Sequence, residues 1–252
     1  MEVSACSPQF LKLYSDIVIF AGQHVITKMH SHHALEIIIP FDANVVLRTE
    51  DSSVKARGLL IQKDMFHSTK AEGFVLFIYI NPETQLGKRL NYLLDKNNVL
   101  KIQDTVIEKI KQYISDLIKN EYSESEISTF LPNVLLKDIT QTEINHNPDL
   151  RVSKVITHIK SNLHKPLSFK ELMDIACLSE SRLIHLFKQE IGIPIRKYVL
   201  WCRLQEAIKY FLKGQTLTQS AHLAGFSDIA HLTRTFVSMF GMTPSQILRK
   251  FN

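Results

Sequence analysis

The sequence predicts an α+β protein with a small N-terminal β-barrel, a helical connector and an all-α C-terminal domain. Three observations predict this class. Short apolar segments separated by turn residues fill the first part of the chain, apolar residues then recur at helical spacing, and the C-terminal part contains an internal repeat. The expected boundaries divide the chain into residues 1–82, 83–146 and 147–252.

The first part of the chain is expected to form strands. Its apolar segments are short, rich in β-branched and aromatic residues, and separated by turn residues such as Gly22, Pro40, Gly58 and Gly73. Many short strands at close spacing are typical of a small barrel or sandwich. The expected strands are residues 17–20, 35–39, 44–47, 59–61 and 74–80.

The connector is expected to be helical at residues 84–94, 105–119 and 125–144. In the second of these helices, Val106, Ile110, Ile114 and Leu117 form one apolar stripe that must be buried. The stripe can pack on the barrel of the same chain or on the equivalent helix of a second copy. A homodimer is therefore an open alternative for this region.

Charge is unevenly distributed along the chain. Residues 1–150 carry 15 Lys+Arg and 19 Asp+Glu, a net charge of −4, whereas residues 151–252 carry 15 and 6, a net charge of +9. A basic C-terminal part is expected if only that part meets a polyanion such as nucleic acid, although uneven charge also arises by chance.

Composition gives no sign of a secreted or membrane protein. No apolar run has the length of a membrane span, and residues 1–10 lack the regions of a signal peptide. The three cysteines, Cys6, Cys177 and Cys202, are odd in number and widely spaced, which does not indicate a disulfide framework. We therefore expect a reduced, cytoplasmic protein.

The C-terminal domain contains a diverged repeat. A break at residues 145–148 precedes it, and Asp149 is expected to cap its first helix, which runs to about Asn162. In each repeat a short helix, a tight turn and a second helix follow one another, which is the pattern of a helix-turn-helix. The two units are expected at residues 168–190 and 216–240. The repeated residues, 49 positions apart, are Ser179, Leu183, Phe187 and Gly192, then Asp228, Leu232, Phe236 and Gly241.

The second helix of each unit has the properties of a reading helix. Ser179 and Asp228 are expected to cap these two helices. One side of each helix is apolar, and the other is polar or small, as a side that enters a major groove must be. A helix is expected between Ile195 and Leu212, and about sixteen helical residues there are about 24 Å long, enough to hold two reading helices apart. The alternative is an ordinary helical bundle with two similar hairpins.

These residues make the chain similar to the AraC/XylS family of bacterial transcription regulators. The similarity is carried by LSESRLIHLFK at 178–188, Gly192, RLQEA at 203–207, AGFSDIAHLTRTF at 224–236 and FGMTP at 240–244. The resemblance implies a sequence-specific regulator that binds double-stranded DNA and acts on RNA polymerase. It also implies a cupin-like N-terminal domain for a small-molecule effector, a connector in which such regulators dimerise, and no catalytic activity.

The chain departs from the family pattern at a few positions. Cys177 stands where the family usually has glycine in the first turn. If that position needs a positive φ, a residue other than glycine costs about 1 kcal/mol there. Met173 and Ser220 replace the usual alanine and isoleucine, and Ile247, Leu248 and Arg249 stand where a tyrosine-arginine pair is usual. None of these departures removes the fold.

The resemblance implies which side chains meet DNA. Arg234 is the foremost candidate for a base contact, and a salt bridge or a phosphate contact is its alternative role. Ile184, Ile229 and Ala230 can touch only thymine methyls, which favours an A·T-leaning site. The residues expected to contact phosphates are Lys188, Arg196, Lys197 and Lys209. Their alternative role is that of ordinary charged residues in contact with solvent. The expected base-facing residues are Ser181, Arg182, Ile184, His185, Ile229, Ala230, Thr233 and Arg234.

The N-terminal domain has a group of residues with metal-ligand spacing. On a strand, His30, His32 and Glu36 point to one face, and His67 is a further candidate. The set suits Zn²⁺, Mn²⁺ or Fe²⁺ and resembles the first metal motif of cupins, but residues 63–67 lack the proline and glycine of the second motif. We expect no cofactor here, with the histidines lining an effector pocket or the barrel wall. A metal-dependent cupin enzyme is the alternative, and it leaves the C-terminal repeat unexplained.

Overall fold

The computed structural model describes residues 7–14, 17–119, 126, 130, 133–134 and 149–248. The chain divides into two compact units. The sheet unit comprises Met1–Ile144 and Val237–Asn252, and the helical unit comprises Asn145–Phe236. The helix expected at residues 125–144 lies almost wholly outside the described residues. The three-part division expected from the sequence stays a prediction.

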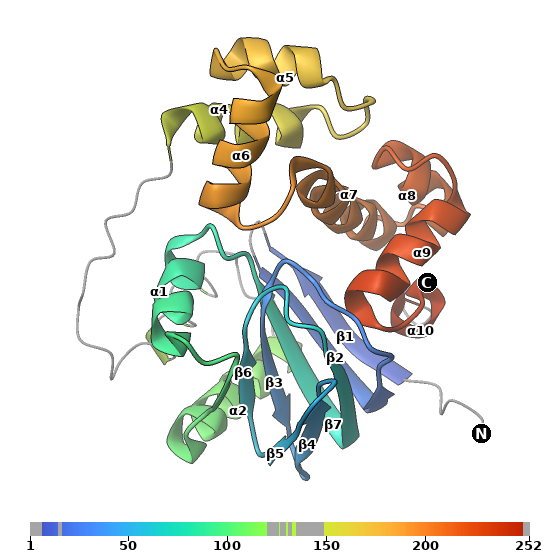
Figure 1. Cartoon of the computed structure of the whole chain (residues 1–252). Coiled ribbons are helices and arrows are strands. Elements are labelled where there is room, and N and C mark those ends of the chain that lie inside the picture. The colour runs from blue at the N-terminus through green and yellow to red at the C-terminus, as the bar shows by residue number, and fades with distance from the viewer. Residues whose placement is uncertain are drawn as a thin grey trace. The chain divides into compact units, whose positions relative to one another are not determined.

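The sheet unit is built on eight antiparallel strands (Figure 1). The order along the main path is β1-β2-β7-β3-β6-β8, and β4 lies between β5 and β7. The pairings among the described residues form an open path, so the sheet is shown and its closure into the expected barrel stays a prediction. The strands are β1 (Ser7–Leu13), β2 (Ile17–Ile26), β3 (Leu35–Pro40), β4 (Val45–Arg48), β5 (Ser53–Ala56), β6 (Leu59–Ile61), β7 (Ser68–Ile80) and β8 (Val99–Lys101).

Strand β7 organises the sheet because it is long enough to pair with three partners. Its last six residues, Val75 to Ile80, pair with β3, and its first four, Ser68 to Ala71, pair with β4, while β2 lies along its other edge. All five strands expected from the sequence are confirmed, and β1, β5 and β8 were missed. The mixed α+β class is also confirmed.

One face of the sheet is covered by two helices. Helix α1 (Gln85–Leu94) begins after Thr84, whose hydroxyl accepts a hydrogen bond from the backbone N–H of Gly87 at 3.0 Å. In helix α2 (Asp104–Lys119), Ile107, Ile110 and Ile114 are fully buried in one core with alternate residues of β2, β3 and β7. Of the predicted stripe, Ile110 and Ile114 are therefore buried within the chain, and Val106 is half-buried against the same core.

The other face of the sheet carries large aromatic side chains and the histidines. Because side chains alternate along a strand, Glu36, Phe77 and Tyr79 point away from the helix-covered face. The rings of Phe20 and Phe77 lie 5.7 Å apart on this face, and Tyr79 stacks beside Phe77. Phe240 belongs to the same unit, and its ring lies 5.2 Å from that of Tyr79.

The helical unit follows the sequence prediction closely. Asp149 caps the first helix by accepting a hydrogen bond from the backbone N–H of Arg151, and Asn162 ends it, as expected. None of the helices in the described ranges is both long and apolar enough to cross a membrane. The helices are α4 (Leu150–Ser161), α5 (Phe169–Ala176), α6 (Glu180–Ile191), α7 (Ile195–Leu212), α8 (Leu217–Leu223) and α9 (Ile229–Phe240), and α10 (Pro244–Leu248) follows in the sheet unit.

Candidate nucleic-acid interface

The first helix-turn-helix is formed by α5, a tight turn and α6. The hydroxyl of Ser168 accepts a hydrogen bond from the backbone N–H of Glu171 at 3.3 Å and so caps α5. Cys177 ends α5 in the left-handed conformation, with φ 51° and ψ 46°. Ser179 occupies the N-cap position of α6, as expected, but its side chain makes no capping hydrogen bond there.

The second helix-turn-helix is formed by α8, a glycine turn and α9. Thr216 and Gln219 form a reciprocal capping box at the start of α8. Gly225 has φ +86°, and a Cβ placed there would lie 2.1 Å from the carbonyl oxygen of Leu163, so only glycine fits this turn. Asp228 caps α9 as expected, because its Oδ1 accepts a hydrogen bond from the backbone N–H of His231 at 2.6 Å. That hydrogen bond lowers the pKa of Asp228.

The repeated apolar residues are buried in both units. Leu183 and Phe187 lie in one core with residues of α4, α5 and α7, and Leu232 and Phe236 are buried in α9. Two helices three turns long therefore present their opposite sides outward. The internal repeat in the sequence thus corresponds to two copies of the same helix-turn-helix structure.

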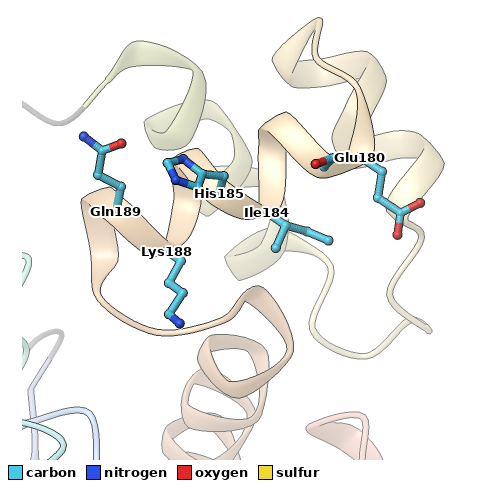
Figure 2. A pocket seen from close by; sticks show the side chains of 6 residues that line it. Glu180, Ile184, His185, Lys188 and Gln189 are labelled. Carbon is cyan, nitrogen blue, oxygen red and sulfur yellow. The ribbon is translucent and has the colours of Figure 1, made fainter.

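The outward side of α6 carries the residues expected to read bases. Ser181, Arg182, Ile184 and His185 are all exposed. Figure 2 shows Glu180, Ile184, His185, Lys188 and Gln189 along this helix. These five residues and Ser181 line an open hollow on the helix. Glu180 and Gln189 were missed by the sequence analysis, although the spacing of Ser181, His185 and Gln189 at every fourth position puts them on one side.

The outward side of α9 is shorter and less polar. Ile229, Ala230 and Arg234 are exposed, whereas Thr233 is half-buried. The charge of Arg234 contributes to the lowered pKa of Asp228. Ile229 keeps 39% of its surface exposed, as does Ile184 on α6.

The four residues expected to contact phosphates differ in their surroundings. Lys188 and Arg196 are exposed, and the guanidinium of Arg196 lies 5.5 Å from the ring centre of Phe169. Lys209 is exposed but pairs with Glu206 at 3.4 Å, and Lys197 is half-buried. Lys188 and Arg196 are therefore the better placed pair for a phosphate backbone.

Helix α7 separates the two helix-turn-helix units. Its bounds, Ile195–Leu212, are those expected from the sequence, and its 18 residues make it about 27 Å long. One side of the helix is buried, and it carries Trp201, Leu204 and Phe211. Arg203 anchors the helix to the loop after α4, because its Nε donates to the carbonyl oxygen of Leu163 at 2.9 Å and its Nη2 to that of Lys165 at 2.7 Å.

In the sheet unit, the four predicted pocket residues are brought together. One ring nitrogen from each of His30, His32 and His67 lies within 4.8 Å of the other two. The Oε2 atom of Glu36 lies 3.3 Å from Nε2 of His32 and 3.0 Å from Nε2 of His67. All four residues are at least 98% buried.

Burial and mutual contact perturb the charges of this group. Burial, together with the charges of His67 and His32, lowers the pKa of His30 to about 3. Burial alone would raise the pKa of Glu36, but hydrogen bonds from His32 and His67 hold it well below its usual range. Burial alone would lower the pKa of His67, but the hydrogen bond to Glu36 outweighs burial, so the pKa of His67 is raised above its usual value. The site therefore favours an ionised Glu36 beside a protonated His67, with His30 neutral.

Comparisons with known proteins agree with this geometry. Residues 172–250 match the model of a helix-turn-helix domain family of the AraC type. The chain is 25% identical over 229 residues to the probable transcriptional regulator LumQ of Photobacterium leiognathi, covering 86% of this chain and 90% of LumQ. It is 24% identical to the uncharacterized regulator SAS0078 of Staphylococcus aureus (strain MSSA476), over 56% of this chain but only 20% of that protein.

Among solved structures, the chain is similar in fold to ToxT of Vibrio cholerae. The apo form of a single-substitution variant of ToxT from strain SCE256 superposes with a TM-score of 0.67 and 15% identity, over 94% of this chain and 98% of that one. Wild-type ToxT described as bound to an unsaturated fatty acid superposes with a TM-score of 0.62 and 14% identity, over 94% and 96%. The domain match, the regulators among its relatives and the two helix-turn-helix units together identify the chain as a transcription regulator with a DNA-binding helix-turn-helix domain of the AraC type.

Proposed function

We propose that the protein recognises a specific promoter sequence by inserting α6 and α9 into two successive major grooves. The observation that carries this proposal is the pair of equivalent helices, each with a buried apolar side and an exposed side of polar or small residues. The distance spanned by α7 is about 27 Å, against about 34 Å for a turn of DNA. Bases are read by the exposed residues of α6 and α9 assigned above.

Affinity and specificity come from different residues in this proposal. Lys188 and Arg196 contact phosphates, which supplies salt-dependent affinity without sequence information. Arg234 contacts a base, for which guanine O6 and N7 are the preferred partners of arginine. Ile184, Ile229 and Ala230 pack on thymine methyls, so the rest of the site is A·T-leaning.

The sheet unit is proposed to bind a small effector that changes how RNA polymerase is engaged at the promoter. The fold likeness to a ToxT chain described as holding a fatty acid supports a ligand-binding role for this unit. A homodimer is part of the proposal, but the described stripe of α2 is buried and does not supply its interface. The proposal assigns no catalytic reaction to the chain, and it places the chain in the cytoplasm with its DNA.

The test is selection of binding sites from random duplexes by the full-length chain at two salt concentrations. The expected result is one motif with two half-sites about one helical turn apart. Arg234→Ala is expected to relax selectivity at one base position and to cost about 1–3 kcal/mol of binding free energy. Lys188→Ala is expected to weaken binding to all DNA sequences alike. It is also expected to reduce the slope of the logarithm of the binding constant against the logarithm of salt concentration by about one unit.

The matched control is Lys55→Ala, which removes one exposed positive charge from β5 in the sheet unit. It is expected to leave both motif and salt slope unchanged. Salt-sensitive binding with no enriched motif contradicts sequence-specific recognition. Equal effects of Lys55→Ala and Lys188→Ala contradict the assignment of the phosphate contact.

A further inference from the structure

The buried histidine group in the sheet unit has a hydrogen-bond pattern that fixes where its protons are. Nδ1 of each ring faces a backbone carbonyl oxygen: His30 faces Lys28 at 2.8 Å, His32 faces Ala34 at 3.0 Å, and His67 faces Met65 at 2.9 Å. A carbonyl oxygen only accepts hydrogen bonds, so Nδ1 carries the proton in all three rings. When a ring is neutral, its Nε2 therefore carries a lone pair, and when Nε2 of His32 or His67 donates to Glu36 that ring is protonated on both nitrogens.

These lone pairs converge on one centre with a carboxylate. Nε2 of His32 and Nε2 of His67 lie 3.3 Å and 3.0 Å from the same oxygen of Glu36. Nε2 of His30 is buried and has no hydrogen-bond partner among the described residues. Acceptor atoms of three histidines and a carboxylate gathered this closely in a buried place are unfavourable unless a cation, either a proton or a metal ion, lies among them.

The spacing suits a small divalent cation. Bonds of about 2.0–2.2 Å from a metal to nitrogen and oxygen place the ligand atoms of a tetrahedral site about 3.3–3.5 Å apart. The distances from Oε2 of Glu36 to Nε2 of His32 and of His67 are close to this value. The three ring nitrogens lie within 4.8 Å of one another and would move closer together around a bound ion. Three imidazoles with one carboxylate favour zinc, cobalt, nickel or iron over calcium or magnesium. The carbonyl contacts of Nδ1 are the outer interactions usual for metal-bound histidine.

The same group touches the chain segment that ends α9. The ring of Phe240 lies 6.4 Å from that of His32, and the backbone N–H of Lys28 donates to the carbonyl oxygen of Gly241 at 2.9 Å. A Cβ at Gly241 would lie 2.8 Å from Nδ1 of His30, so the backbone here is in close contact with the histidine ring. Within the sheet unit, the histidine group is therefore packed close to the last turn of α9 and to the glycine that follows it.

We propose that His30, His32, His67 and Glu36 bind one divalent transition-metal ion, and that this ion is the effector of the regulator. The second half of the proposal rests on the proposed function. The ion holds the rings of His30 and His32 in place, and through Phe240 and Gly241 it restricts the end of α9. Metal occupancy is thereby linked to the affinity of the chain for its DNA site.

The first experiment measures metal binding without DNA. Metal-free full-length chain is titrated with Co²⁺, followed by its visible absorption, and Zn²⁺ is then added as a competitor. One equivalent of Co²⁺ per chain, displaced by Zn²⁺ and not by Mg²⁺ or Ca²⁺, is the expected result. His30→Gln and Glu36→Gln are expected to weaken binding more than the tenfold to hundredfold that loss of an outer interaction costs.

The control variant is His24→Asn, which removes an exposed histidine of the same unit at a left-handed position that asparagine tolerates. It is expected to bind Co²⁺ as the unaltered chain does. Circular dichroism shows which variants are folded, and only folded ones are compared. Failure of the unaltered chain to bind Co²⁺ overturns the proposal, as does binding that is equal in His24→Asn and in His30→Gln.

The second experiment compares the affinity of the chain for its selected DNA site with and without Zn²⁺. Zn²⁺ is expected to change the dissociation constant for DNA at least about fivefold in the unaltered chain and to leave it unchanged in His30→Gln. Metal binding without a shift overturns the effector role. Absence of DNA binding in both states counts against the proposed function instead, and it leaves the metal titration standing as an independent result.

Discussion

Nε of Arg203 donates a hydrogen bond to the carbonyl oxygen of Leu163 at 2.9 Å. That oxygen belongs to the loop after α4, and it also lies against the glycine turn of the second helix-turn-helix. One backbone carbonyl thus contacts both α7 and the turn between α8 and α9. The position of the second helix-turn-helix relative to the first depends on this point of contact within the helical unit.

Replacing Arg203 by alanine is expected to destabilise the chain by about 2 kcal/mol. The substitution leaves the carbonyl oxygens of Leu163 and Lys165 without a charged donor, and hydrogen bonds to charged groups contribute about 1.5–3 kcal/mol. Urea unfolding measures the change. Lys213→Ala, at an exposed position, is the control, and a loss of equal size there would show that charge alone accounts for the effect.

Gly225→Ala is expected to cost at least about 3 kcal/mol, because the new Cβ meets the Leu163 carbonyl at 2.1 Å in addition to the strain of a positive φ. Gly214→Ala is a matched control. Gly214 has φ +89°, and a Cβ there meets nothing within 4 Å, so only the backbone strain of about 1 kcal/mol is expected. Similar losses of unfolding free energy in the two variants would contradict the steric explanation.

Cys177→Gly is expected to stabilise the chain by up to about 1 kcal/mol. Cys177 has φ 51°, a conformation that is unfavourable for any residue with a Cβ, as the sequence comparison with the family suggested. Cys177→Ala separates the backbone effect from that of the thiol, since alanine keeps the strain. Thermal or urea unfolding of both variants makes the comparison, and a gain in Cys177→Ala equal to that in Cys177→Gly would rule out backbone relief.

Replacing thymine by uracil in the selected DNA site is expected to reduce affinity about fourfold for each methyl group that is buried by a side chain, because a buried methyl contributes about 0.8 kcal/mol. Ile184→Ala is expected to lose sensitivity to uracil at one position only. The measurement is a binding titration with singly substituted duplexes. Uniform insensitivity to uracil would remove the physical basis of the A·T preference.

The sequence predicted the helical unit better than the sheet unit, for physical reasons. Helix α7 has a buried stripe, and its neighbours Pro194 and Gly214 mark its limits locally. Strand β8 is three residues long and exists only because it pairs with β6 some forty residues earlier, which no local pattern contains. Ser179 illustrates a different limit, since a suitable residue type at an N-cap position does not ensure the hydrogen bond.

The histidine group was only partly predictable. Strand parity placed His30, His32 and Glu36 on one face, although residues 31–34 are not in a strand. His67 reaches them through the backbone bridge between His30 and His67, a long-range pairing. The carbonyl contacts of the three Nδ1 atoms depend on loop geometry, and no sequence pattern records them.

The two isoleucines on the reading helices have a thermodynamic consequence. Ile184 and Ile229 each leave 39% of their surface in water in the free chain, and a groove that covers them releases that water. Burial of apolar surface lowers the heat capacity, so the enthalpy of association becomes more negative as temperature rises. For a regulator of this kind, calorimetry at several temperatures reports on side chains that form no hydrogen bond with a base.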